Sequence, residues 1–296
     1  MKQISPLRGL TLGTGLLLGH WGQAQVAAAD RAQVYAVPTT SMSSRFQVPQ
    51  VRLPNAAVAR RINQRLLRDV RSNFATVDST VSPARQLRQA ARECCYDQET
   101  KSWRAGGDGL TGTGYRVLLN QDFLLSLAFS REERGFDEPG GPHLTFDLRT
   151  GRCLTLADLL ADPPAELNRR FAGAINRRLR ADLADVAANY GDLDTIDRVA
   201  QLYGFYGVDE WNTTPRHQPA ADTTASVPPA RQSYPDDFAL RPNALLLFYS
   251  IGMARVDFEF LPDDTYVFPY KRLHPRGLLV AVAKKAQQKN PRRVRH

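Results

Sequence analysis

The sequence predicts an α+β fold in which an antiparallel β-sheet is packed by long amphipathic helices. Two observations lead to this prediction. Apolar residues recur at a spacing of about four in two arginine-rich segments, 58–74 and 167–186, as they do along the buried face of a helix. Other segments are short alternating or apolar runs joined by short turns, and such connections favour antiparallel strands.

Each of the two predicted helices has a continuous apolar stripe. We expect the first helix to begin after Asn55, a residue type favoured at helix N-caps. The second should extend from Glu166 to Tyr190 and lie across the sheet, with its arginines outward. The stripes consist of Val58, Ile62, Leu66, Val70 and Phe74 in the first helix, and of Leu167, Phe171, Ile175, Leu179, Leu183 and Val186 in the second.

The β-rich segments form two groups. In the first, residues 115–119 and 123–129 predict a hairpin, and residues 144–148 predict a further strand that leads through a turn to a short helix capped by Thr155. A segment rich in Pro, Thr, Ala and Ser then separates the groups, and its composition predicts an exposed loop. The second group consists of short strands at 238–240, 245–249, 256–260 and 266–268.

The two ends of the chain differ from its body. Residues 1–24 have the basic, apolar and small-residue order of a cleavable signal peptide. Its apolar part spans roughly 10 residues, whereas a helix needs about 20 to cross a bilayer, so we expect export to the periplasm or outside the cell and no membrane span. We expect residues 25–283 to form one domain with an exposed loop at 212–235, and residues 284–296 to form a disordered basic tail.

The net charge of +9 is concentrated at the two ends. Lys2 and Arg8 lie in the signal peptide, and the tail 284–296 carries six basic residues and no acidic one, so eight of the nine charges belong to the ends and the body carries +1. A neutral body does not predict a nucleic-acid partner. The arginine-rich faces of the two long helices are read as solvated surfaces, with a joint groove for an anionic partner as the alternative.

The chain has three cysteines, Cys94, Cys95 and Cys153. In an oxidising compartment one pair can close, and adjacent cysteines rarely bridge each other, so Cys153 should pair with Cys94 or Cys95. We take Cys95 and Cys153 as the expected disulfide.

The sequence contains none of the common catalytic signatures. It has no nucleophile elbow, phosphate-binding loop or zinc-protease helix, and the four histidines after the signal peptide do not stand at metal-ligand spacing, so we expect no catalytic residue, metal or cofactor. The most pointed feature is Gly140, Gly141 and His143. It is read first as a tight turn whose histidine satisfies a backbone carbonyl, and second as a ligand site beside Asp137, Glu138 and Asp147.

Several motifs occur together in a familiar order. They are the hairpin at 115–126, the glycine turn 140–143, the strand and helix start at 145–159, and the last strand at 266–273. In this order they resemble the extracytoplasmic domain of RsiV-like anti-sigma factors, a domain of unknown function that also precedes some peptidoglycan deacetylase domains. The resemblance covers roughly residues 46–280. The sigma-binding segment, the membrane helix and the deacetylase domain of those proteins have no counterpart here, so we expect the sensor or accessory domain standing alone.

The resemblance implies a noncatalytic binding or sensor domain of the bacterial cell envelope. Its ligand would be a secreted protein such as lysozyme or a cell-wall glycan such as peptidoglycan, and the candidate ligand-binding residues are Gly140, Gly141, His143 and Tyr270. Two alternatives stay open. One is an envelope enzyme that acts on glycan through acids the sequence does not reveal. The other is a structural envelope protein whose basic tail binds anionic polymer. The sequence does not set the oligomeric state.

Overall fold

The computed structural model describes residues 30–38, 47–71, 85, 96–103, 110–133, 141–190, 192–205, 237–251 and 260–288. The strands in these ranges are β1 (Gln33–Pro38), β2 (Gln47–Arg52), β3 (Tyr96–Asp97), β4 (Ser102–Trp103), β5 (Leu110–Gln121), β6 (Leu124–Glu133), β7 (His143–Asp147), β8 (Phe238–Leu240), β9 (Ala244–Phe248) and β10 (Thr265–Pro269). The helices are α1 (Ala56–Arg71), α3 (Leu156–Leu159), α4 (Pro164–Tyr190), α5 (Leu193–Leu202), the 3-10 helix η4 (Tyr270–Arg272) and α7 (Leu279–Gln288).

All strand pairs among the described residues are antiparallel. The two larger sheets have the orders β5-β6-β7 and β10-β9-β8, and β1-β2 and β3-β4 form two-stranded ribbons. With a 16-residue α1 and a 27-residue α4 packed around these sheets, the predicted α+β class is confirmed.

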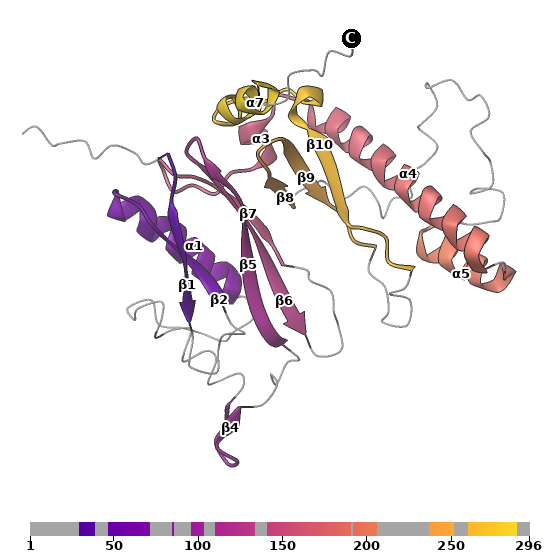
Figure 1. The fold of residues 1–296 in the computed structure, drawn as a ribbon, viewed down its shortest axis with the longest axis horizontal. Coiled ribbons are helices and arrows are strands. Elements are labelled where there is room, and N and C mark those ends of the chain that lie inside the picture. The colour runs from indigo at the N-terminus through magenta and orange to yellow at the C-terminus, as the bar shows by residue number, and fades with distance from the viewer. Residues whose placement is uncertain are drawn as a thin grey trace, which may run out of the picture.

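The sheet β5-β6-β7 is buried on both of its faces. Side chains alternate across a strand, so Leu125 and Leu127 of β6 face one cluster of buried residues, which includes Ile62 and Leu66 of α1, while Leu124 faces the other. The second cluster contains the buried stripe of α4 and the apolar residues of β8, β9 and β10. Figure 1 accordingly shows α1 and α4 on opposite sides of the sheets.

This arrangement corrects one alternative. The arginine-rich faces of α1 and α4 do not form a joint groove, because the sheets lie between the two helices (Figure 1). Each helix instead buries its own apolar stripe in a separate cluster.

The helix predictions agree with the structure at the level of single residues. Asn55 caps α1, its side-chain oxygen accepting hydrogen bonds from the backbone N–H of Ala57 at 3.1 Å and of Val58 at 3.2 Å. At α3, the backbone N–H of Thr155 donates to the Asp158 carboxylate at 2.8 Å, as in a capping box. All six apolar residues predicted to be buried in α4 are buried. Helix α5, which the sequence analysis does not predict, is capped by Asp192.

The hairpin of β5 and β6 is confirmed, but its turn consists of residues 122–123 and not of the predicted residues 120–122. Asp122 and Phe123 have φ values of 53° and 64°, and two consecutive positive values are required by a two-residue type I′ turn. Phe123 therefore belongs to the turn and not to β6. Its backbone bridges neighbouring segments, since its N–H donates to the carbonyl of Asp30 at 3.0 Å and its carbonyl accepts from Leu148 at 2.8 Å.

The predicted tail is wrong at its start. Residues 284–288 belong to α7, which packs Leu279, Val282 and Ala283 into the core. Lys285 holds this helix against the hairpin turn by an ion pair with Asp122. The apolar residues just before 284 thus continue a helix that the basic composition of the segment does not reveal.

Some expectations fall outside the described residues. These are the signal peptide 1–24, the loop 212–235, residues 256–259 of one expected strand, and the tail from residue 289. The single-domain organisation also stays a prediction. Within the described ranges, no helix combines the length and the apolar character that crossing a membrane requires.

Candidate functional site

His143, the residue singled out by the sequence, is held by a carboxylate from a distant part of the chain. Its Nδ1 lies 2.8 and 3.0 Å from the two carboxylate oxygens of Asp237, and its backbone N–H donates to the same carboxylate at 3.1 Å. The imidazole also stacks on Phe248 with ring centroids 3.6 Å apart and planes 6° from parallel. The His143 side chain is only 12% exposed, and its contact with Asp237 joins β7 to the chain before β8.

This geometry corrects the expected partners of His143. The sequence predicts that His143 contacts a backbone carbonyl, or that it forms a ligand site beside Asp137, Glu138 and Asp147. In the structure Asp147 accepts hydrogen bonds from the backbone and side chain of Arg149 instead. Asp137 and Glu138 lie outside the described residues.

Gly141 allows the backbone at this position to pack closely against another backbone segment. A Cβ at this position would lie 2.5 Å from the carbonyl oxygen of Phe129, a distance that real Cβ atoms do not adopt. The neighbouring carbonyl of Pro142 accepts a hydrogen bond from the Phe129 N–H at 3.2 Å. The requirement for glycine at 141 is therefore explained by packing. Gly140 lies outside the described residues.

Tyr270 is a core residue. It is 2% exposed, and its hydroxyl donates a 2.6 Å hydrogen bond to the carbonyl of Arg241. Burial raises the pKa of its hydroxyl far above the ordinary value. A role of His143, Gly140, Gly141 or Tyr270 in ligand binding stays a prediction.

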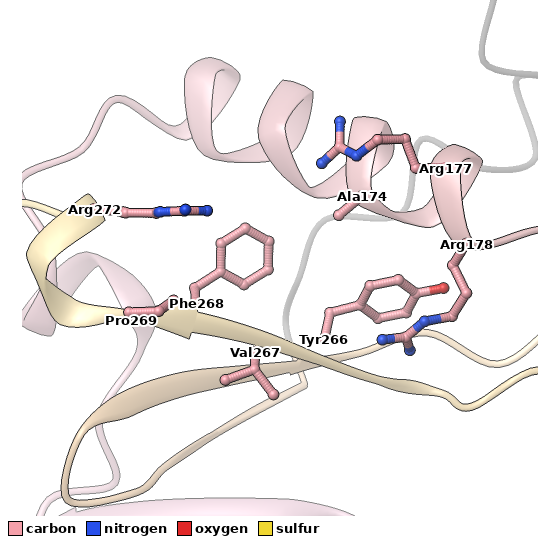
Figure 2. Close-up of a pocket in the computed structure, with 8 residues that line it drawn as sticks. All are labelled: Ala174, Arg177, Arg178, Tyr266, Val267, Phe268, Pro269 and Arg272. Carbon is pink, nitrogen blue, oxygen red and sulfur yellow. The ribbon is translucent and has the colours of Figure 1, made fainter. Parts of the chain in front are cut away.

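A cavity of about 230 Å³ lies between α4 and β10, next to Tyr270. Figure 2 shows the residues that surround it, with Phe268 and Tyr266 pointing from β10 toward α4 and Val267 pointing the other way. The lining consists of Ala174, Arg177, Arg178, Tyr266, Val267, Phe268, Pro269 and Arg272. Three of these eight residues are arginines and none is acidic.

The floor of the cavity is aromatic, and its rings pack against a buried ring of α4. Tyr266 and Phe268 alternate with Val267 on β10, so both rings lie on the face toward α4. Phe171 of α4 meets both rings edge-on, with centroids 5.4 Å from Tyr266 and 6.3 Å from Phe268. Tyr266 is buried, whereas Phe268 is half-buried and leaves part of its ring to the cavity.

The three arginines differ in how they are engaged. The guanidinium of Arg178 donates to the carbonyl oxygen of Thr265 at 2.8 Å and lies over the Tyr266 ring, so it is held in place. The guanidiniums of Arg177 and Arg272 are exposed and have no acidic partner or hydrogen-bond acceptor among the residues that the structure describes. The cavity therefore has two arginines available to an anion at its rim.

The backbone of Arg272 is fixed by a buried ionic network. Arg170 of α4 donates to the Arg272 carbonyl at 2.9 Å and to the Asp162 carboxylate at 3.1 Å. The fully buried Asp162 side chain also accepts from the backbone N–H of His274 at 2.7 Å. Burial acts to raise the pKa of Asp162, but these hydrogen bonds and nearby positive charges outweigh burial and lower it below its ordinary value.

Two buried polar atoms near this region have no hydrogen-bond partner among the residues that the structure describes. They are the hydroxyl of Tyr266 and one carboxylate oxygen of Asp182. Burial raises the pKa of Tyr266 to about 12 and also raises the pKa of Asp182. A phenol with such a pKa stays neutral at ordinary pH and is no nucleophile.

The residues of this cavity are not predicted from the sequence. Arg177 and Arg178 are predicted to lie on a solvated helix face, and no pattern singles out Arg272 or Phe268. The available signal was weak: Ala174 and Arg178 flank the buried stripe of α4 at a spacing of four, which places both at the border between core and solvent.

Cys153 forms no disulfide with any described residue, and burial raises the pKa of its thiol. Cys95 lies outside the described residues, so the expected disulfide stays a prediction. Within the described ranges, no three His, Cys, Asp or Glu side chains gather in a way that could hold a metal ion.

No family model and no curated protein matches the chain. The structure is similar to the crystal structure of a DUF3298 family protein from Pseudomonas aeruginosa PAO1. The TM-score is 0.39, the sequence identity is 15%, and the match covers 84% of this chain and 93% of that chain. DUF3298 is the family of the RsiV-like domain. At this TM-score the similarity carries no conclusion about function.

Proposed function

We propose that this chain is an exported, noncatalytic binding domain of the cell envelope, and that it binds an anionic cell-wall glycan at the cavity between α4 and β10. The observation that carries the proposal is the pair of available guanidiniums, on Arg177 and Arg272, at the rim of a cavity with an aromatic floor. Export is inferred from the signal-peptide pattern of residues 1–24.

Binding is favoured over catalysis by the chemistry of the lining. Most glycoside hydrolases use two carboxyl groups on either side of the scissile bond. The eight residues that line the cavity include no carboxyl group. The buried Tyr266 hydroxyl, with its raised pKa, cannot replace one.

A glycan is favoured over a secreted protein by the size and polarity of the site. A stable protein interface buries about 800 Å² on each partner around an apolar centre. The exposed large hydrophobic residues of the described ranges are few and come from different elements: Val117, Tyr190, Leu193 and Val267. A cavity of about 230 Å³ instead accommodates one ring-sized group of a longer ligand.

The test is co-sedimentation of the exported chain, residues 25–296, with isolated peptidoglycan at about 0.15 M salt, where exposed charges are screened. The binding-site variant carries Arg177→Glu and Arg272→Glu together. The control is Arg169→Glu, an exposed arginine on the same helix that does not line the cavity. A parallel measurement uses lysozyme as the ligand.

We expect saturable binding to peptidoglycan that falls at least about tenfold in the double variant, because each charge-assisted hydrogen bond contributes about 1.5–3 kcal/mol. The control variant should bind like the wild type. The double variant reverses two charges and the control one, so equal losses of binding free energy per reversed charge would reduce the effect to net charge. Binding to lysozyme alone would replace the glycan by a protein ligand.

A further inference from the structure

The cavity between α4 and β10 has features that restrict the class of ligand further than its charge does. The first feature is size. Sites for drug-sized molecules occupy about 300–1,000 Å³. The open cavity lined by Ala174, Phe268 and their neighbours, with about 230 Å³, holds one ring and its substituents.

The second feature is a flat ring surface. Phe268 lies in the cavity between Ala174 and Arg272 in Figure 2 and makes a T-shaped contact with the buried ring of Phe171. The face of an aromatic ring is weakly negative and attracts the weakly positive C–H groups of a saturated ring. Pro269 extends this apolar surface. A sugar ring presents one face of C–H groups and fits such a platform.

The third feature is the kind of anion that the walls can bind. Tetrahedral phosphate is usually bound with the help of free backbone N–H groups, as at helix N-termini. The cavity is walled by the middle of α4, where the N–H groups are used within the helix, and by Pro269, which has no N–H. The guanidiniums of Arg177 and Arg272 supply planar forks that match carboxylate and phosphate alike, so the preference for a carboxylate rests on these backbone groups.

We propose that the cavity binds an acidic sugar residue, with its ring against Phe268 and its carboxylate between Arg272 and Arg177. This inference rests on the proposed function, since it names the group of the glycan that the site recognises. The acidic sugar can be a free monosaccharide or a unit within a polymer, and the carboxylate and the ring face are the same in both.

The inference is tested by titrating the exported chain with four small probes, followed by NMR or calorimetry: glucuronate, glucose, acetate and phosphate. Glucuronate carries both the ring and the carboxylate. Glucose lacks the carboxylate, acetate lacks the ring, and phosphate lacks both. We expect saturable binding of glucuronate that is at least about tenfold tighter than that of any other probe, a difference of about 1.4 kcal/mol.

Three variants assign the two contacts. Arg272→Gln should weaken glucuronate binding at least about tenfold by removing the charge, and Arg169→Gln should leave it unchanged. Phe268→Leu keeps an apolar side chain and removes the flat ring, so glucuronate affinity should fall while acetate affinity stays the same. Thermal unfolding of each variant establishes that it is folded.

The outcomes separate this inference from the proposed function. The proposal of an acidic sugar is wrong if phosphate or acetate binds as tightly as glucuronate. It is also wrong if Phe268→Leu leaves the protein folded and has no effect on glucuronate binding. Peptidoglycan binding that depends on Arg177 and Arg272 would then still stand. If neither peptidoglycan nor any probe binds, both proposals are wrong.

Discussion

Arg178 lies over the ring of Tyr266, with its guanidinium carbon 4.1 Å from the ring centroid. The same guanidinium binds the backbone carbonyl of Thr265, the residue before Tyr266. One arginine of α4 thereby fixes both the side chain and the backbone at the start of β10. The aromatic floor of the cavity depends on this contact, because Tyr266 and Phe268 lie on the same strand.

We predict that Arg178→Ala destabilises the protein by about 2–3 kcal/mol, since it removes hydrogen bonds from a charged donor and a cation–π contact. The matched control is Arg177→Ala, the adjacent arginine without a partner among the described residues, which should change stability by less than about 0.5 kcal/mol. Urea unfolding measures both. Similar effects of the two substitutions would mean that the Arg178 contacts contribute nothing to stability.

Asp182→Asn should leave stability at pH 7 unchanged or raise it by up to about 1 kcal/mol, because the carboxylate is half-buried and partly screened by water. Burial raises the pKa of Asp182 in the folded protein, although Arg178 acts against this. The folded state then holds more protons than the unfolded state just above the ordinary pKa of about 4. Ionisation of Asp182 therefore lowers the free energy of unfolding as pH rises.

The measurement for Asp182 is urea unfolding of the wild type and the variant at pH 7 and pH 4. The difference should shrink at pH 4, where the wild-type carboxyl becomes protonated. A variant that is less stable than the wild type at pH 7 would show that the charged form of Asp182 is favourable in the folded protein.

The sequence predicts those parts of the fold that depend on interactions between residues close together in the chain. The α4 stripe follows from a spacing of four, and the caps at Asn55 and Thr155 follow from local hydrogen bonding. The position of the hairpin turn is predicted wrongly, because a type I′ turn usually carries Asn-Gly or Asp-Gly, whereas this chain has Asp122 and Phe123.

The cavity and the His143 contact could not be predicted in the same way, because their partners are far apart in the sequence. His143 and Asp237 are separated by 94 residues, and Arg178 and Thr265 by 87. No local pattern indicates which carboxylate meets the histidine or which arginine stays without a partner. The arginines of α4 look alike in the sequence, and only the packing of α4 against β10 distinguishes Arg177 from Arg178.

Asp162→Asn should destabilise the protein at pH 7 by about 1–3 kcal/mol, because a buried carboxylate that binds Arg170 and His274 becomes a neutral amide. The pKa of Asp162 is lowered in the folded state, so its contribution is present above about pH 4 and is lost as pH falls through the folded pKa. Urea unfolding should give a clear difference at pH 7 and a smaller one at pH 3. A constant difference would exclude this electrostatic explanation.

Gly141→Ala and Gly173→Ala should have opposite effects on stability. At Gly141 the new Cβ would meet the Phe129 carbonyl at 2.5 Å, so the backbones must separate at a cost of about 1–3 kcal/mol. Gly173 lies within α4, where the nearest atom is the flexible Arg177 guanidinium at 3.5 Å. Alanine there should stabilise the helix by up to about 1 kcal/mol. Thermal unfolding of both variants provides the comparison, and a tolerated alanine at 141 would contradict the close approach.

His143 distinguishes the two interpretations of the glycine turn. Its Nδ1 is occupied by Asp237 and its ring is covered by Phe248, so we interpret it as a structural link between β7 and the chain before β8. His143→Ala should therefore cost about 1–3 kcal/mol of stability, from a lost charge-assisted hydrogen bond and a lost ring contact. Peptidoglycan binding by the folded variant should stay at the wild-type level. Loss of binding with the fold intact would instead make His143 a ligand-binding residue and move the site from α4 and β10 to the end of β7.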